Sequence, residues 1–256
     1  MMNRIDYIRK IAANNFWGDM ARSPQDRQPL DDEGWNSLFI SCLVNRGIQW
    51  ERAMGSATEL GFVNEMKMRS GIHDTLTLFT INNDVLLEWL AFDDDGDYAA
   101  AGGRNGSLLR YRYTVEHCHQ AMCRIRDEWG GSARFLHADE PTGQQFLQRV
   151  MSFGGYGAKT SGLYCRVAVL SHGVTLWDNY AGLDISPDRH CSRVMTRLGL
   201  VSEDASPQEV IDKARELSPY APVEWDGLFI IGLDYCHASD PECSICALIG
   251  VCGSRC

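Results

Sequence analysis

Four cysteines that stand close together near the end of the chain constrain its fold more than any other feature. Cys236, Cys243, Cys246 and Cys252 are separated by six, two and five residues. Four thiolates in so short a segment can surround one compact metal site, and thiolates are the soft ligands that iron–sulfur clusters and zinc prefer. We therefore predict a metal site in residues 236–252, hereafter the cysteine loop. Cys256 follows closely and is either a free thiol or a substitute ligand.

The composition is that of a soluble globular protein. Of the 256 residues, 45% are hydrophobic and 23% are charged, and no apolar run approaches the length of a membrane span. The N-terminal segment mixes charged with apolar side chains and lacks the apolar core of a signal peptide. We therefore expect a cytoplasmic protein without a membrane partner, whose ten cysteines serve metal binding rather than a disulfide framework. The net charge of −10 counts against binding nucleic acid over the whole surface, although a local basic face remains compatible with it.

Hydrophobic residues recur mainly at helical spacing, so we predict an all-α protein. No stretch of strands separated by hairpin signals competes with this pattern. One helix is expected to break at Asn82–Asn83 and another to end at Gly130–Gly131. We expect Asp93–Ser107 to be a solvated loop rather than a calcium site, because the position where an EF-hand loop needs glycine is Tyr98. Helices are predicted over 35–60, 75–92, 113–129, 144–151, 161–170, 187–198 and 207–217.

Residues 153–161, FGGYGAKTS, form a second candidate site. Gly155 and Gly157 stand between two amphipathic segments, where glycine permits a tight turn and a close approach of the backbone. The N–H groups at the start of the next helix, those of Ala158 and Thr160 included, then point outward, and a helix N-terminus attracts a phosphate. We predict that this turn binds one DNA phosphate without reading sequence. Taken alone, a plain helix–helix connection is the commoner use of such a turn.

Lys159 follows directly on this turn. It is one of only four lysines among 24 basic residues. A lysine at a buried helix start can lose its proton through desolvation and act as an amine nucleophile, which arginine cannot do at accessible pH. A solvent-facing lysine without chemistry is an equally good explanation while the motif is taken alone.

A third candidate lies in residues 187–200, PDRHCSRVMTRLGL. Ser186 or Asp188 can cap a helix here, and the helix dipole stabilises a carboxylate at a helix N-terminus as the anion. Such an anion suits a place beside a developing positive charge. Taken alone, the segment is better explained as a helix cap without chemistry, and Asp178 and Asp184 are close enough in sequence to be rivals.

Taken in order, these segments resemble the helix–hairpin–helix DNA glycosylases of the endonuclease III type. The cysteine spacing matches the iron–sulfur loop of that family, and GYGAKTS matches its hairpin turn, with Lys159 at the position of the catalytic lysine. DRHCSRVMTRLGL matches the family's D-x-H-x-x-R-V segment and places Asp188 at the catalytic aspartate. The gap between the two is longer than usual, which keeps Asp178 and Asp184 as rivals. The resemblance covers most of residues 35–252, and the three motifs in this order are specific together.

The resemblance implies two helical domains. Residues 35–186 would form a six-helix barrel that carries the helix–hairpin–helix motif. Residues 1–34 and 187–256 would form a discontinuous domain that holds a structural [4Fe–4S] cluster on the four cysteines of the cysteine loop. A monomer would bind double-stranded DNA between the domains, with a damaged or modified base flipped into a pocket. Asn45 and Arg46 would fill the hole that this base leaves, and residues 93–106 would supply part of the pocket.

The implied activity is that of a DNA glycosylase with associated AP-lyase activity. Lys159 would attack the sugar C1′, displace the base, form a Schiff base and permit strand cleavage by β-elimination. Asp188 would stabilise the positive charge on the sugar in the transition state. Two alternatives remain open: a glycosylase-fold transferase or processing enzyme for hypermodified, phage-type bases, and a non-catalytic iron–sulfur DNA-binding module. The presence of both Lys159 and an aspartate in the right segment counts against the module.

Overall fold

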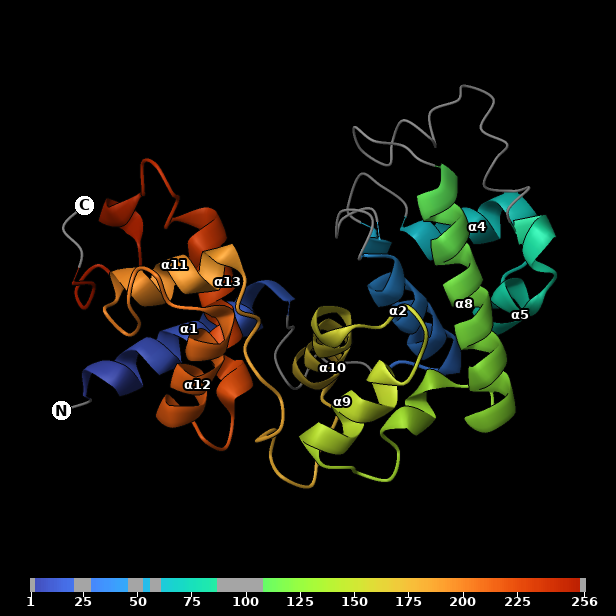
Figure 1. Cartoon of the computed structure of the whole chain (residues 1–256), viewed down its shortest axis with the longest axis horizontal. Coiled ribbons are helices and arrows are strands. Elements are labelled where there is room, and N and C mark those ends of the chain that lie inside the picture. The colour runs from blue at the N-terminus through green and yellow to red at the C-terminus, as the bar shows by residue number, and fades with distance from the viewer. Residues whose placement is uncertain (1–2, 21–28, 46–52, 56–60, 87–107, 254–256) are drawn as a thin grey trace. The chain divides into compact units, whose positions relative to one another are not determined.

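The computed structural model describes residues 3–20, 29–45, 53–55, 61–86 and 108–253. All regular structure within these ranges is helical, which confirms the predicted all-α fold class (Figure 1). The chain divides into two compact units, each described here by itself. Unit 1 comprises residues 1–29, 140–147 and 165–256, and unit 2 comprises residues 30–139 and 148–164. The predicted domain boundaries stay a prediction; the grouping of residues 140–147 and 165–186 with unit 1 differs from them.

Unit 1 is built from α1 (Arg4–Met20) and the C-terminal helices. Helix α1 packs against the 3-10 segment η2 (Pro222–Gly227) and α13 (Leu228–Asp234), and α11 (Arg189–Arg197) packs against α13 and α12 (Pro207–Leu217), as Figure 1 shows. Their shared core is aliphatic around one tryptophan. Its fully buried members include Ile8, Ala12, Val210, Trp225 and Leu228.

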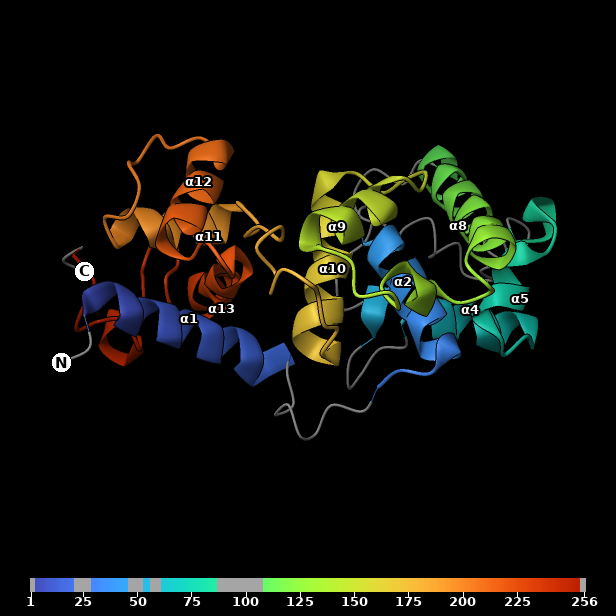
Figure 2. The same cartoon turned by 90° about the horizontal axis from the view of Figure 1, so that it is seen from below.

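Unit 2 is organised around α2 (Asp32–Val44), most of whose residues are buried. The helix packs against α4 (Phe62–Ser70), α5 (Thr75–Thr80) and α8 (Leu108–Glu128), an arrangement that Figure 2 shows from below. The buried amide of Asn36 joins α2 to the chain beyond α8, because it donates to the Gly131 carbonyl at 2.9 Å and accepts the Ala133 N–H at 2.8 Å. The boundary between the units falls within α9 (Gly143–Met151) and α10 (Ala158–His172).

Local signals placed several helix ends correctly. Helix α12 begins at Pro207, as predicted, with a capping box in which Ser206 and Glu209 exchange hydrogen bonds. Helix α8 ends at two glycines with φ of +60° and +86°. Helix α5 ends at Thr80, and helix resumes at Asn83, close to the expected break.

Some expectations concern residues outside the described ranges, namely Arg46, most of the segment 46–60, the loop 93–107 and Cys256. Within the described part of the chain, no helix combines the length and apolarity that crossing a bilayer requires.

Candidate functional site

The glycine turn of residues 153–157 is fixed to the aromatic core of unit 2. The ring of Phe39 lies 5.1 Å from that of Phe153 and 4.7 Å from that of Tyr156. The Tyr156 hydroxyl donates to the Phe39 carbonyl at 2.6 Å, a buried hydrogen bond. The turn is therefore held on both sides of its central glycines by groups that come from α2.

Gly155 is required by the fold of this turn. Its φ is +86°, a conformation that costs a residue with a Cβ atom about 1–2 kcal/mol. A Cβ atom at this position would also lie 2.9 Å from the Cγ atom of the His117 ring and 2.9 Å from Leu43 Cδ1. Both observations agree with the expected tight turn.

No contact within the protein requires glycine at position 157. It is exposed, and a Cβ atom placed there would meet nothing within 4 Å. It precedes α10, and its carbonyl accepts the Ser161 N–H at 2.9 Å. Because the first N–H groups of a helix have no intrahelical acceptor and carry the positive end of the helix dipole, a bare backbone at this position suits an anion. Of the neighbouring residues named for this role, Ala158 is exposed and Thr160 is buried.

Lys159 stands in the first turn of α10 and is exposed. Of the two alternatives left open by the sequence, a buried helix start and a solvent-facing lysine, the structure shows the solvent-facing one. The amine is accessible to solvent. Lys159 belongs to unit 2, whereas the candidate aspartates belong to unit 1.

Asp188 is the N-cap of α11, as one of the two predicted alternatives had it. Its Oδ1 accepts the backbone N–H groups of His190 and Cys191, both at 2.8 Å. These bonds hold the carboxylate at the positive end of the helix and satisfy two donors that have no intrahelical acceptor. Ser186, the other candidate cap, instead donates its own N–H to Asp226 Oδ1 at 2.5 Å.

The rival aspartates have different partners. Asp178 accepts the Gly143 N–H at 2.9 Å and so fixes the loop after α10 to the start of α9. Asp184 forms two hydrogen bonds with Arg215, at 2.7 and 2.8 Å. Of the three, only Asp188 is the N-cap residue of the helix that follows it.

A buried ion pair contacts the segment that leads to Asp188, and the sequence did not predict it. Arg166 Nε lies 2.6 Å from Asp226 Oδ2, and the two side chains are 9% and 8% exposed. Burial raises the pKa of the Asp226 carboxyl in spite of Arg166. The same desolvation, together with Asp226 and Asp188, raises the pKa of the Cys191 thiol. The one sequence signal was an arginine within the apolar run YCRVAVL of α10, since a charge in a buried stretch needs a partner.

The cysteine loop brings three of the four predicted ligands together. Cys236, Cys246 and Cys252 are partly buried against the core of unit 1. Burial raises the pKa of the Cys246 thiol, the Leu248 N–H opposes this effect, and the sulfurs of Cys236 and Cys252 raise the pKa further. The neutral thiol of Cys246 is therefore favoured in this structure.

Arginines of α11 hold this loop. Arg197 Nη1 donates to Cys236 Sγ at 3.1 Å and to the His237 carbonyl at 2.7 Å, and Cys252 Sγ lies 3.5 Å from the Arg197 carbonyl. Arg193 Nε donates to the Cys236 carbonyl at 2.6 Å. No local pattern in the sequence had indicated a role for either side chain.

The sulfurs of the cysteine loop are the ligand type of zinc and of iron–sulfur clusters alike. Within the described residues, no group of three or more histidine, cysteine, aspartate and glutamate side chains is arranged to hold a metal ion. A zinc ion needs sulfurs that converge at about 2.3 Å on one point, whereas a four-iron cluster spreads its ligands over four metal atoms. Sulfur is the ligand type of both centres, and Arg197 Nη1 adds a donor to Cys236 Sγ. Cys243 is disulfide-bonded, so its sulfur would become a ligand only after reduction.

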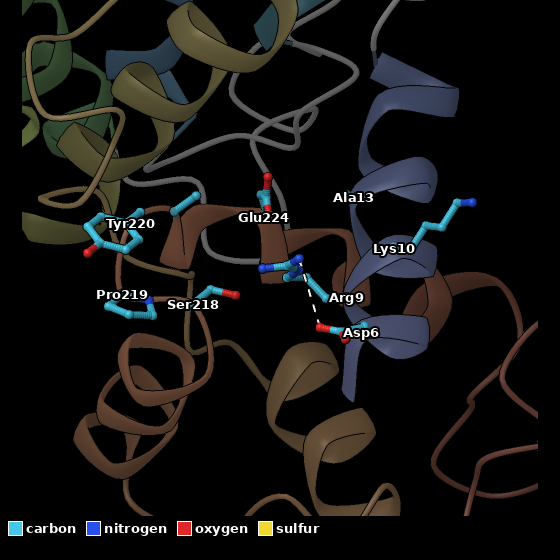
Figure 3. Close-up of a pocket in the computed structure, with 9 residues that line it drawn as sticks. Asp6, Arg9, Lys10, Ala13, Ser218, Pro219, Tyr220 and Glu224 are labelled. Carbon is cyan, nitrogen blue, oxygen red and sulfur yellow. Dashed lines mark ion pairs between the residues drawn. The ribbon is translucent and has the colours of Figure 1, made fainter. Parts of the chain in front are cut away.

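Asn45 and the cavity of unit 1 add little support for a DNA-binding site. Asn45 ends α2 as its C-cap, and its backbone N–H donates to the Ser41 carbonyl at 3.2 Å. A cavity of about 500 Å³ opens within unit 1 between α1 and the chain before η2 (Figure 3). Arg9 and Lys10 line it together with Asp6 and Glu224, and the balanced charges match a phosphate backbone poorly. None of the predicted site residues lines this cavity.

Comparison with known proteins places the fold. No protein-family model and no curated protein matches the chain. Among the similar solved structures, a trapped covalent intermediate of endonuclease III with DNA is 18% identical, with a TM-score of 0.55, over 99% of this chain and 97% of that one. A non-covalent endonuclease III–DNA complex is 17% identical, with a TM-score of 0.54, over 99% and 96% of the two chains. A thermostable thymine-DNA glycosylase is 14% identical, with a TM-score of 0.56, over 98% of each chain.

At these identities the likeness concerns the architecture, and it runs over nearly the whole of each chain. It agrees with the resemblance that the order of the three motifs predicted, and this chain shares the helical fold of these endonuclease III and thymine-DNA glycosylase structures.

Proposed function

We propose that the protein is a DNA glycosylase with associated AP-lyase activity, which acts as a monomer on a damaged or modified base flipped out of double-stranded DNA. The single observation that carries this proposal is the pairing of Lys159 with Gly157. An accessible amine stands in the first turn of a helix, two residues after a glycine that leaves the backbone open. The fold likeness to endonuclease III and thymine-DNA glycosylase supports DNA as the partner.

The turn would bind the DNA backbone and Lys159 would do the chemistry. A phosphate at the start of α10 meets the N–H groups of the first helical turn and the positive end of the helix dipole. The Lys159 amine would attack the sugar C1′ as the bond from C1′ to the base breaks, and one amine proton would pass to the departing base. The C1′–O4′ bond would then open, O4′ would take the second proton, and the Schiff base would form. Abstraction of a proton from C2′ would then expel the 3′ phosphate by β-elimination. Arginine at this position would keep the charge but could not form the Schiff base.

Asp188 would stabilise the sugar as it gains positive charge. Its carboxylate is held by two backbone N–H groups, so its orientation is set before the substrate arrives. A fixed anion aimed at developing charge contributes more than one that must reorganise during the reaction. The buried Arg166–Asp226 pair supports this segment, because Asp226 accepts the Ser186 N–H two residues before Asp188.

A [4Fe–4S] cluster on Cys236, Cys243, Cys246 and Cys252 is the cofactor that this proposal includes. When bound, it would cross-link the cysteine loop and brace unit 1 without taking part in the reaction. The Arg197 donor to Cys236 Sγ supports the assignment, since hydrogen bonds to the sulfurs are a usual feature of such clusters. Asp240 and Glu242 make the loop acidic, so we assign it to bracing rather than to gripping DNA.

Borohydride trapping on DNA with an abasic site tests the amine. We expect wild type to form a covalent product and Lys159→Arg to form none while still binding the DNA. Lys213→Arg is the matched control, because Lys213 is also surface-placed on a helix and pairs with Glu216. Equal trapping by wild type and Lys159→Arg would refute the role of Lys159. DNA binding without trapping by wild type would instead favour the transferase or the non-catalytic module.

The visible spectrum tests the cofactor. Protein purified anaerobically with a thiol reductant should be brown, and Cys246→Ser should lose the colour together with iron and sulfide. Cys123→Ser is the control, because Cys123 lies in unit 2. A colourless protein that contains zinc would refute the cluster.

A further inference from the structure

Trp177 is 80% exposed, more than any other large hydrophobic side chain among the described residues. It lies in the connection between α10 and α11, residues 173–188. Burial alternates along the start of this connection: Val174 and Leu176 are buried, whereas Thr175 and Trp177 are exposed. Alternation with a period of two is the pattern of an extended segment with one face on the protein. The indole therefore belongs to the outward face of an anchored segment.

Backbone hydrogen bonds hold this segment on unit 1. The Val174 N–H donates to the Ala168 carbonyl and the Trp177 N–H to the Pro141 carbonyl, both at 3.2 Å. The next side chain, that of Asp178, accepts the Gly143 N–H at 2.9 Å. A ring on so fixed a backbone loses little conformational freedom when it binds a partner.

The chain beyond Trp177 makes a strained turn. Asn179 has φ of +52° and Tyr180 has φ of +84°, and positive φ is uncommon for asparagine and a real outlier for an aromatic residue. The turn closes on the buried residues Leu183 and Ile185. Strain of this kind persists where the surrounding structure enforces it, and it concentrates at functional sites.

We propose that the Trp177 ring is a stacking platform for an unstacked base of the DNA substrate. This inference rests on the proposed function for its partner. A protein partner would need an apolar patch of several hundred Å², whereas Trp177 is one ring flanked by exposed polar residues such as Thr175 and Asn179. A planar base is the ligand that one exposed aromatic ring suits, because every base has a π face and stacking needs no sequence.

The acidic residues of the connection do not oppose this partner strongly. Asp178 is engaged by a backbone N–H. Asp184 is neutralised by the two hydrogen bonds of Arg215. Stacking itself requires no positive charge, so the platform would select for an unpaired base while other residues meet the phosphates.

Binding of three labelled probes tests the platform: an intact duplex, a duplex with an unpaired base and a single strand. We expect Trp177→Ala to weaken binding of the two probes with unstacked bases about 5- to 150-fold, the range that one lost aromatic–base stack implies. Binding of the intact duplex should change little, and Trp177→Phe should retain most of the affinity. Tyr220→Ala is the matched control, since Tyr220 is a 76% exposed aromatic residue of the same unit.

Two results would overturn the inference. Trp177→Ala could bind all probes as wild type does, or it could lose affinity equally for the intact duplex, with circular dichroism showing an unchanged fold. Repeating the measurement in a Lys159→Arg background separates this proposal from the enzymatic one. If Trp177→Ala binds unstacked bases more weakly but wild type shows no trapping, the lyase activity is refuted and the platform stands. If wild type is trapped but Trp177→Ala binds all probes normally, the platform is refuted and the lyase activity stands.

Discussion

Substitution of Asp226 by asparagine would leave a charge buried without its partner. The Asp226 carboxylate lies 2.6 Å from Arg166 Nε and accepts the Ser186 N–H, and both side chains of the pair are less than a tenth exposed. Asparagine has nearly the same shape but no charge. The Arg166 guanidinium would therefore stay in the interior of unit 1 without a counter-ion.

The expected loss follows from burial. Removing one partner of a buried ion pair costs about 3–5 kcal/mol of unfolding free energy, whereas an exposed pair contributes about 0–1 kcal/mol. Burial raises the Asp226 pKa despite Arg166, so desolvation opposes the attraction within the pair. We therefore expect the loss to come from the arginine left without a partner. For a chain of this size the melting temperature should fall by roughly 6–20 °C.

Asp184→Asn provides the matched control. Asp184 also pairs with an arginine of unit 1, but Arg215 and Asp184 are 49% and 23% exposed. Urea unfolding followed by circular dichroism gives both free energies, and unchanged m-values show that the same surface unfolds. We expect Asp184→Asn to lose at most about 1 kcal/mol.

Two results would refute the reasoning. The first is that Asp226→Asn costs no more than Asp184→Asn. The second concerns the double variant Arg166→Met with Asp226→Leu, which should recover most of the stability because no unpaired charge remains. If the double variant is as unstable as Asp226→Asn, packing rather than the unpaired charge causes the loss.

The other predictions concern the glycine turn and a buried histidine. Gly155→Ala should cost at least about 1–2 kcal/mol of unfolding free energy, because the φ of Gly155 is +86° and the new Cβ atom would meet His117. Gly157→Ala should change the unfolding free energy by less than about 0.5 kcal/mol and weaken DNA binding. Equal stabilities of the two variants in urea would contradict this prediction. Burial, and then Arg134, lower the pKa of His137 from 6.5 to about 4, so the folded protein favours the neutral ring. The stability that this contributes is complete above pH 6.5 and is lost as the pH falls through about 4, up to about 3 kcal/mol. His137→Phe should flatten this part of the urea-measured pH profile, and an unchanged profile would contradict the assignment.

The sequence predicted those features whose causes are local. The helix predicted over 207–217 has these bounds in the structure, and its capping box joins Ser206 to Glu209, only three residues away. Asp188 caps α11 through N–H groups two and three residues away, which is why one of two predicted caps was right. The four-cysteine spacing and the hairpin motif, taken in order, indicated the fold to which the solved structures are similar.

Only the tertiary structure decided the features that join distant residues. Arg166 and Asp226 are sixty positions apart, and Arg197 reaches Cys236 across thirty-nine, so no local pattern relates them. The exposure of Lys159 depends on the neighbours that unit 2 provides, and a sequence does not state them. The cysteine loop was the most constraining feature of the sequence, and the structure adds that three of its sulfurs share one place on the core of unit 1. Spacing along the chain determines which residues can meet, whereas burial and partners, which set the charge and reactivity of each group, exist only after the chain has packed.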